Sequence, residues 1–360
     1  MSGKSPGRWC CYVLVLSMVF AVFFGQPFSV LGASDRELVT VSWGGRYTEA
    51  ERKAFFDPFE KETGAKVVPV TSLGDRWAKA RLQVESGNVE WDLISGVNQE
   101  KMVRYQDLLE KIDYSIVVNT ENLISGAVNE YGTGHNQESV NMAYNRNAFA
   151  ESHPTTWAEF WDVKKFPGPR TFPNWGGSWF QPIAFALLAD GVSREALIPF
   201  DYDRAFKKLD ELKPHVGVWW TSGSQFQQVL RDEEVVLGAG WDMRIVDLGK
   251  KGFPIGMEWN QGHCYVTYWC VLKGTKKKDL AMQFINSTLL PERQLVFTRV
   301  IGASPSNEKT FELLTDDEKA IRGSYPPNRE KMFAFSPEEW SYIEKNVKDM
   351  QERWEKWIAE

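Results

Sequence analysis

The chain has 360 residues, 43% hydrophobic and 25% charged, so it is long enough for two globular lobes and too apolar for a disordered protein. It carries 42 Lys and Arg against 48 Asp and Glu, a net charge of −6, which argues against nucleic-acid binding because that requires clustered basic residues. Aromatic residues make up 14% of the chain, more than core packing usually needs, so some are expected to line a binding surface.

The first 33 residues have the pattern of a secretory signal peptide. Lys4 and Arg8 precede an apolar run over residues 10–24, and small residues lead up to a cleavage site at Ala33. A helix that crosses a bilayer needs about 20 apolar residues, and this run is shorter. An uncleaved N-terminal anchor is the alternative. No cysteine stands at the cleavage point, so no lipid anchor is expected. Cleavage removes two cations and no acid, which gives a soluble periplasmic protein of net charge −8.

Strands and helices alternate through the first third of the chain. The patterns predict strands at 38–43, 65–70 and 91–94, and helices at 50–63, with a restart at Asp57, and at 75–86. Gly64 and Gly87 are expected to end the two helices. This spacing indicates β-α-β units in a mostly parallel sheet with helices on both faces. Ligands of such sheets bind at the carboxyl ends of strands, where Trp43 and Ser95 are predicted to lie.

The rest of the chain continues in this style. Further helices are predicted from Thr156 through Trp161 and at 181–188, 205–212, 279–287, 292–300 and 338–358, and further strands at 235–241 and 264–272. The last strand would hold Cys264 and Cys270 about 20 Å apart, beyond disulfide reach, so two buried free thiols are expected. No linker or repeat marks a boundary between lobes.

The residues that usually carry catalysis or bind cofactors do not form recognisable motifs. The four histidines, His135, His153, His215 and His263, form no metal-binding pair, and no Gly-x-Ser-x-Gly or Gly-x-Gly-x-x-Gly segment is present. The sequence therefore predicts no enzyme, no metal site and no cofactor. An extracytoplasmic hydrolase is the alternative from another class.

Several segments, in the same order, resemble the spermidine/putrescine type of periplasmic solute-binding protein. The colinear match runs over residues 38–310 and includes the segments 41–47, 59–64, 92–102, 156–161, 240–241 with the strand at Tyr265, and 301–307. The resemblance implies an α/β, two-lobed, type II periplasmic-binding fold, each lobe a mostly parallel sheet flanked by helices, with a hinge between the lobes.

The resemblance also implies limits for the lobes and a function. The first lobe would comprise residues 34–139 plus 267–310, and the second 140–266 plus 311–360. Closure of the hinge on a small-molecule solute would let the receptor dock on the permease subunits of an ABC importer in the inner membrane. The protein is expected to be a monomer, and a sensor that reports ligand to a membrane partner stays open as a third possibility.

The resemblance implies ligand-binding residues on both lobes and near the crossover between them. They are Trp43, Gly44, Ser95, Trp175, Trp241, Arg244, Tyr265 and Thr267. At four positions where polyamine receptors carry acids, this sequence has Gly45, Asn174, Gly177 and Thr267.

Arg244 stands where an acid would clamp an amine. A buried cation repels a diammonium ligand, so we expect a carboxylate-bearing or zwitterionic solute, with a polyamine as the alternative. Arg244 could instead lie on a surface helix, bonded to Asp247 or Asp242.

Overall fold

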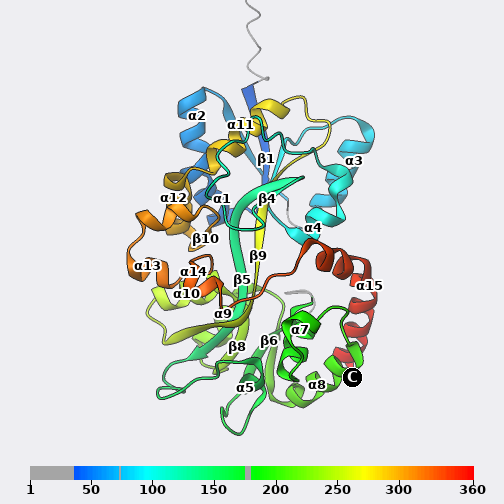
Figure 1. Cartoon of the computed structure of the whole chain (residues 1–360), viewed down its shortest axis with the longest axis vertical. Helices are drawn as coiled ribbons and strands as arrows, with labels where there is room; N and C mark the ends of the chain where they lie inside the picture. Colours follow the sequence, from blue (N-terminus) through cyan, green and yellow to red (C-terminus); the bar gives the residue numbers. More distant parts are fainter. Residues whose placement is uncertain (1–35, 73, 175–179) are drawn as a thin grey trace, which may run out of the picture.

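The computed structural model describes residues 36–72, 74–174 and 180–360. The predicted signal peptide and the predicted ligand residue Trp175 lie outside these ranges. The molecule is elongated and has two lobes, one above the other in Figure 1, each a sheet flanked by helices. The predicted two-lobed α/β fold is therefore confirmed.

The first lobe is built on three parallel strands, β1 (Glu37–Ser42), β2 (Lys66–Thr71) and β3 (Leu93–Asn98). The flanking elements are α1 (Gly45–Glu51), the π-helical turn η2 (Arg52–Phe56), α2 (Asp57–Thr63), α3 (Arg76–Ser86), α4 (Gln99–Arg104), η3 (Gln106–Leu108), α11 (Lys278–Thr288) and α12 (Pro291–Ile301). As predicted, a new helix begins at Asp57, and left-handed Gly64 and Gly87 end α2 and α3. Glycine fits both caps because φ is positive, 69° and 71°.

The second lobe repeats the plan with parallel strands β8 (Leu237–Trp241), β6 (Arg170–Pro173) and β7 (Val216–Trp220). Its helices are α5 (Trp157–Trp161), α7 (Gln181–Ala189), η4 (Arg194–Ala196), α8 (Tyr202–Leu212), η5 (Lys213–His215), α9 (Gly223–Arg231), α10 (Asp242–Lys250) and α15 (Pro337–Ala359). α5 begins where the sequence predicts, and Thr156 is its N-cap, because its side chain accepts from the Glu159 amide.

Two long antiparallel strands, β5 (Gly132–Asn145) and β9 (Ile255–Val271), run through both lobes and join them (Figure 1). They make one continuous sheet in the order β2-β1-β3-β9-β5-β8-β6-β7. The short strands β4 (Val128–Asn129) and β10 (Ser304–Pro305) also pair with β5, and η6 (Glu308–Leu313), α13 (Asp316–Ala320) and α14 (Pro326–Arg329) follow β10. The predicted lobe limits at 139 and 267 fall inside β5 and β9 and stay predictions.

Most of the described tryptophans pack the cores. Trp157, Trp220, Trp269, Trp340 and Trp354 are among the largest fully buried side chains. Cys264 and Cys270 are buried free thiols, as predicted. The cores therefore account for much of the aromatic content, and a partly exposed tryptophan is an exception to explain.

Candidate functional site

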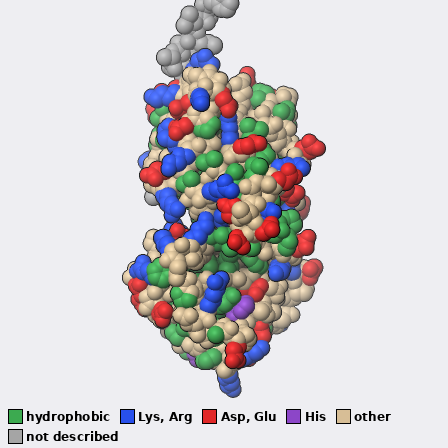
Figure 2. All heavy atoms as spheres, turned by 90° about the vertical axis from the view of Figure 1, so that its left-hand side faces the viewer, with side chains coloured by type: hydrophobic (Ala, Val, Ile, Leu, Met, Phe, Trp, Pro, Cys, Tyr) green, Lys and Arg blue, Asp and Glu red, His purple; other side chains and the backbone are tan. Residues whose placement is uncertain are grey.

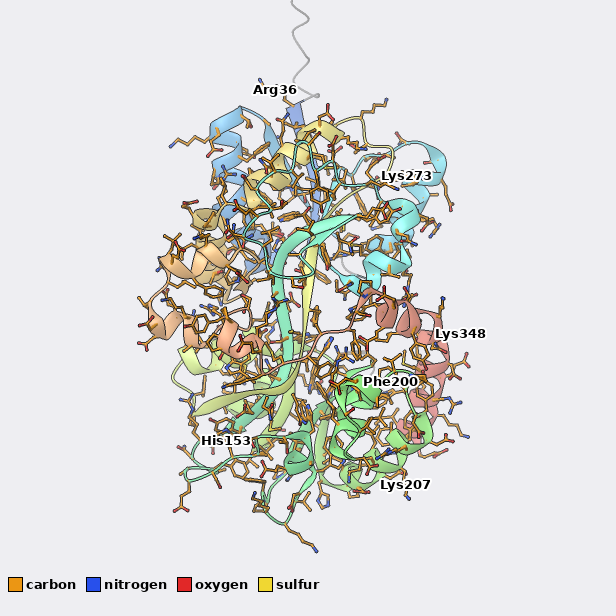
Figure 3. The ribbon with its side chains drawn as sticks, viewed as in Figure 1. Arg36, His153, Phe200, Lys207, Lys273 and Lys348 are labelled. Carbon is orange, nitrogen blue, oxygen red and sulfur yellow. The ribbon has the colours of Figure 1, made fainter. Side chains whose placement is uncertain are left out.

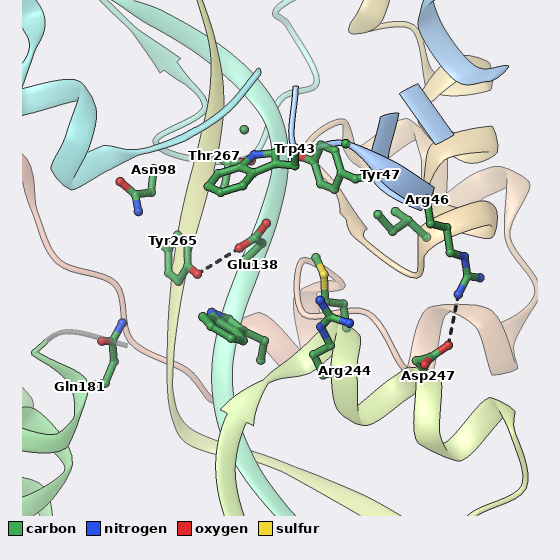
Figure 4. A pocket seen from close by; sticks show the side chains of 15 residues that line it. Trp43, Arg46, Tyr47, Asn98, Glu138, Gln181, Arg244, Asp247, Tyr265 and Thr267 are labelled. Atoms are coloured by element: carbon green, nitrogen blue, oxygen red, sulfur yellow. Dashed lines mark hydrogen bonds and ion pairs between the residues drawn. The ribbon is translucent and has the colours of Figure 1, made fainter. Parts of the chain in front are cut away.

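A cleft of about 590 Å³ lies between the lobes, where the molecule narrows in Figure 2 and basic side chains gather at the indentation. The side chains drawn in Figure 4 line it. The first lobe contributes Trp43, Gly44, Arg46, Tyr47, Gly96, Asn98 and Ile301, the second lobe Gln181, Trp241, Met243, Arg244 and Asp247, and the connecting strands Glu138, Tyr265 and Thr267. Six of the eight predicted ligand residues are thus brought together.

Trp43 is the aromatic wall of the first lobe. It follows β1 and precedes Gly44, whose φ of 79° turns the chain sharply away into α1. Its side chain is 44% exposed, unlike the core tryptophans. The guanidinium carbon of Arg76 lies 3.8 Å from its ring centroid, which holds the indole in place. A Cβ at Gly96 would lie 2.5 Å from the indole nitrogen, so this close approach requires glycine.

Trp241 and Arg244 belong to the junction between β8 and α10 in the second lobe. Trp241 is the N-cap residue of α10 and packs on Trp220 with ring centroids 4.9 Å apart. Arg244 lies on the first turn of α10, is half-buried, and donates to the Gln227 amide oxygen at 3.2 Å. Among the described residues it forms no ion pair, so its charge is available in the cleft.

The surface alternative for Arg244 named Asp247 or Asp242 as a partner. Asp242 instead accepts a hydrogen bond from the Met243 amide at 2.7 Å. Asp247 instead binds Lys251 at 2.8 Å and Arg46 at 3.4 Å (Figure 4). Arg46 and Arg244 therefore line the cleft from different lobes, and of these two described residues only Arg46 forms an ion pair with an acid.

Glu138 is a cleft residue that the sequence did not reveal. It lies on β5, is half-buried, and accepts a hydrogen bond from the Tyr265 hydroxyl at 3.0 Å (Figure 4). Burial raises the pKa of Glu138, while the bond from Tyr265 and the nearby charge of Arg244 oppose that shift. An acid and a guanidinium from different elements therefore face one cleft, and Glu138 is not one of the four positions that the resemblance singled out for acids.

The remaining predicted ligand residues differ in position. Thr267 and Tyr265 lie side by side on β9, and Thr267 donates to the Asn136 side-chain oxygen at 2.7 Å. Ser95 is fully buried, has no hydrogen-bond partner for its hydroxyl among the described residues, and does not line the cleft. It lies inside β3 at a register irregularity between Ile94 and Val97, rather than beyond the strand end.

A buried network of polar side chains lies behind the first-lobe wall of the cleft. His135 on β5 contacts the Glu51 carboxylate through Nε2 at 3.0 Å and the Asn136 oxygen through Nδ1 at 2.7 Å. Tyr47, which lines the cleft, stacks on the His135 ring at a centroid distance of 5.7 Å. Ser42, the last residue of β1, donates to Glu51. These bonds tie β1, α1 and β5 together under the ligand surface.

Two ion pairs join the lobes, one at the cleft and one outside it. Arg46 of α1 meets Asp247 of α10, and Arg104 of α4 binds Glu344 of α15 at 2.7 Å. Glu100 binds the same Arg104 at 2.6 Å. The described lobes are therefore in contact on either side of the hinge strands.

Comparison with known proteins places this architecture in a family. The sequence model of one family, the bacterial extracellular solute-binding proteins, matches residues 54–320 of this chain. The gamma-aminobutyric acid-binding protein of Pseudomonas aeruginosa is 33% identical over 93% of this chain and 95% of that protein. The chain belongs to the bacterial extracellular solute-binding protein family.

Two further similarities bear on structure and ligand. The crystal structure of an ABC transporter substrate-binding protein from Bradyrhizobium japonicum USDA 110 superposes with a TM-score of 0.80 at 32% identity, covering 89% of this chain and 99% of that one. The spermidine/putrescine-binding periplasmic protein of Escherichia coli K12 is 24% identical over 78% of this chain and 81% of that protein. The predicted family is confirmed, and the polyamine alternative is the weaker one.

The relatives are binding receptors rather than enzymes. In the part of the chain that the structure describes, no helix has the length and apolarity to cross a membrane. Within the same part, no group of three His, Cys, Asp or Glu residues could hold a metal ion.

Proposed function

We propose that the protein is the substrate-binding receptor of an ABC importer and captures a small amino acid with its amino and carboxylate groups at opposite ends. Gamma-aminobutyric acid, the ligand named for the Pseudomonas relative, is a solute of this kind. The observation that carries the proposal is that Glu138 and Arg244 line one cleft, between aromatic walls formed by Trp43 and Trp241.

Each end of such a solute has a matching group. The half-buried Glu138 carboxylate can accept from an ammonium group, and the Arg244 guanidinium can donate two parallel hydrogen bonds to a carboxylate. Trp43 and Trp241 would pack on the methylene chain, while Tyr265 and Thr267 complete the wall from β9. We also propose ligand contacts for Gly44 and, from the family resemblance alone, for Trp175.

The same charges disfavour a polyamine. A diammonium ligand held at Glu138 would bring its second charge toward Arg244. Like charges within about 4 Å repel by roughly 4 kcal/mol at the effective dielectric of a partly solvated site. A zwitterion instead meets one acid and one base, so its binding buries no uncompensated charge.

The test is calorimetry with three compounds of similar length on the purified mature protein. Gamma-aminobutyric acid has both charged groups, butyrate lacks the ammonium, and putrescine replaces the carboxylate with a second amine. We expect gamma-aminobutyric acid to bind at least tenfold more tightly than either. Equal or tighter binding of putrescine would contradict the proposal and restore the polyamine alternative.

Delivery to a permease and residence in the periplasm complete the proposal. The support is the family membership, the ABC transporter relative and the signal-peptide pattern of residues 1–33. N-terminal sequencing of protein released by osmotic shock is expected to begin at or near Ser34, and light scattering is expected to give the mass of a monomer. Recovery only from membranes with residues 1–33 attached would contradict this location.

A further inference from the structure

A second hollow of about 310 Å³ lies in the first lobe beside the cleft, and neither the family resemblance nor the proposed function uses it. It shares Trp43, Gly96 and Asn98 with the cleft, so Trp43 stands between the two spaces. Its other walls come from the first turn of α3 and from α4 with Tyr105. Trp77 and Tyr105 stack face to face with centroids 4.4 Å apart and give it a flat, rigid side.

Arg76 lines this hollow, and part of its guanidinium group has no hydrogen-bond partner among the described residues. The residue is only 4% exposed, its Nε donates to the Ser72 carbonyl at 3.0 Å, and its Nη2 is buried with no hydrogen-bond partner among the described residues. A buried donor left without an acceptor costs about 1 to 3 kcal/mol, so such a group calls for an acceptor that the described chain does not provide. Burial lowers the pKa of Arg76 to about 10, which leaves it charged at neutral pH.

The nearby acids are engaged elsewhere. Asp75 accepts from the Ser72 hydroxyl at 3.0 Å and binds Lys79 at 2.8 Å. Glu51 raises the pKa of Arg76 by its charge, but its oxygens contact Ser42 and His135. No described residue that lines the hollow is an Asp or Glu. Arg76 therefore has the ring face of Trp43 against its guanidinium, but its positive charge meets the described acids only at a distance.

Two further features add positive potential. The hollow lies at the N-terminus of α3, a helix of 11 residues, and Asp75 at its N-cap makes no capping hydrogen bond with its side chain. Exposed amides and the helix dipole at such an end favour anions. Lys101 also lines the hollow, and its charge is shared with Glu100 at 3.0 Å.

We infer that the hollow behind Trp43 is an oxyanion-binding subsite in which Arg76 and the first turn of α3 hold a carboxylate or a group of similar chemistry. The oxyanion is either a second acidic group on a solute that occupies the cleft and extends past Trp43, or a separate free anion. The stacked Trp77 and Tyr105 rings suit the aliphatic arm of the first kind of ligand. Gamma-aminobutyric acid has no second acidic group, so the subsite goes beyond the proposed function.

The experiment uses matched probes on the full mature protein. L-2-Aminoadipate is compared with L-norleucine, which has the same chain without the terminal carboxylate, and 2-aminosuberate is compared with 2-aminooctanoate in the same way. Inorganic phosphate, at constant ionic strength set with sodium chloride, tests the free anion. Affinity is measured by calorimetry and thermal shift for the wild type, Arg76→Gln, Arg76→Lys and Arg81→Gln. Arg81 is the control, because it lies on α3 but is 40% exposed and pairs with Asp107 outside the hollow.

If the solute carries the oxyanion, the wild type and Arg81→Gln bind at least one acidic probe with tenfold or higher affinity than its neutral counterpart. That advantage is lost in Arg76→Gln and partly kept in Arg76→Lys. If a free anion binds, phosphate stabilises the wild type and Arg81→Gln but not Arg76→Gln, while the acidic probes gain nothing. Either result supports the subsite. If no acidic probe and no anion distinguishes the wild type from Arg76→Gln, the inference is overturned.

Circular dichroism and the unfolding midpoint show whether Arg76→Gln is folded. If it is not, Lys101→Gln supplies the test from the other side of the hollow, since Glu100 keeps Arg104 as a partner in that variant. We then expect Lys101→Gln to weaken the acidic probe or phosphate by about threefold or more, and unchanged binding overturns the subsite. Phosphate binding does not depend on Glu138 or Arg244, so failure of the subsite and failure of the proposed amino-acid ligand are distinguishable.

Discussion

Replacing Glu138 by glutamine separates ligand recognition from folding, because the two properties are expected to change in opposite directions. Glutamine keeps the size of the side chain and can still accept from the Tyr265 hydroxyl, which bonds Glu138 at 3.0 Å. It removes the negative charge that we propose to bind an ammonium group. A hydrogen bond to a charged group contributes about 1.5 to 3 kcal/mol, so the affinity for gamma-aminobutyric acid is expected to fall by roughly 10- to 150-fold.

The stability of the variant is expected to stay the same or to rise. Burial raises the pKa of Glu138, so the folded protein binds its proton more tightly than the unfolded chain does. Ionisation of Glu138 at neutral pH therefore costs free energy of folding, and Glu138→Gln removes that cost. For the same reason, wild-type affinity for the ammonium ligand is expected to decline as pH falls through the raised pKa, whereas the affinity of the variant stays flat.

The assay pairs calorimetry with urea denaturation, and butyrate is the control ligand. Butyrate lacks the ammonium group, so its affinity for Glu138→Gln is expected to be unchanged or higher. Unchanged affinity for gamma-aminobutyric acid would show that the ammonium group binds elsewhere. Loss of affinity for both ligands together with loss of stability would show that Glu138 is a structural residue, and either outcome would refute the reasoning.

Four further substitutions test the rest of the site. Trp43→Ala is expected to cost on the order of 1 to 3 kcal/mol of affinity by calorimetry with little change in unfolding midpoint, since the side chain is 44% exposed; gross unfolding would assign it to the core. Arg244→Ala is expected to weaken carboxylate binding about tenfold or more, and equal affinity would leave it a helix-surface residue. Arg46→Gln is the matched control for Arg244, with affinity expected to stay within about threefold because its pair with Asp247 is 63% and 21% exposed. For Asp242→Asn, burial and the charge of Glu138 raise the Asp242 pKa from 3.8 to about 7, so the wild type is expected to lose stability relative to the variant as pH rises from about 4 to about 7 in urea titrations, with no further loss above that range; parallel pH profiles would contradict that assignment.

Local signals in the sequence were sufficient for much of the fold. The strand before Trp43, the helix restart at Asp57 and the stops at Gly64 and Gly87 depend on nearest neighbours and on φ preferences, and each occurs where predicted. The same local pattern indicated that Trp43 ends a strand, and the tertiary structure places it on the cleft.

Strand β5 was not predicted because its sequence lacks the local alternation that indicates a strand. Residues 132–145 read GTGHNQESVNMAYN, with no alternation of apolar and polar side chains, and most of them are buried. Polar residues such as His135 and Asn136 can be buried there because Glu51 on α1 and Thr267 on β9 supply hydrogen-bond partners. Because β5 was not predicted, Glu138 was overlooked, although the lobe limit implied at residue 139 lies beside it.

Three features of the site were decided by tertiary structure alone. Pairing of β3 with β9 continues to Asn98, so Ser95 lies inside the strand and is buried instead of standing at its end. The sequence left two positions open for Arg244, and the packing of α10 against β9 and α9 turned its side chain into the cleft. Glu138 and Arg244 are more than a hundred residues apart, and only the two hinge strands bring them to one site. Hydrophobic period and helix caps are properties of neighbouring residues, whereas the charge balance of an interlobe cleft depends on contacts between distant segments, and no short stretch of sequence contains that information.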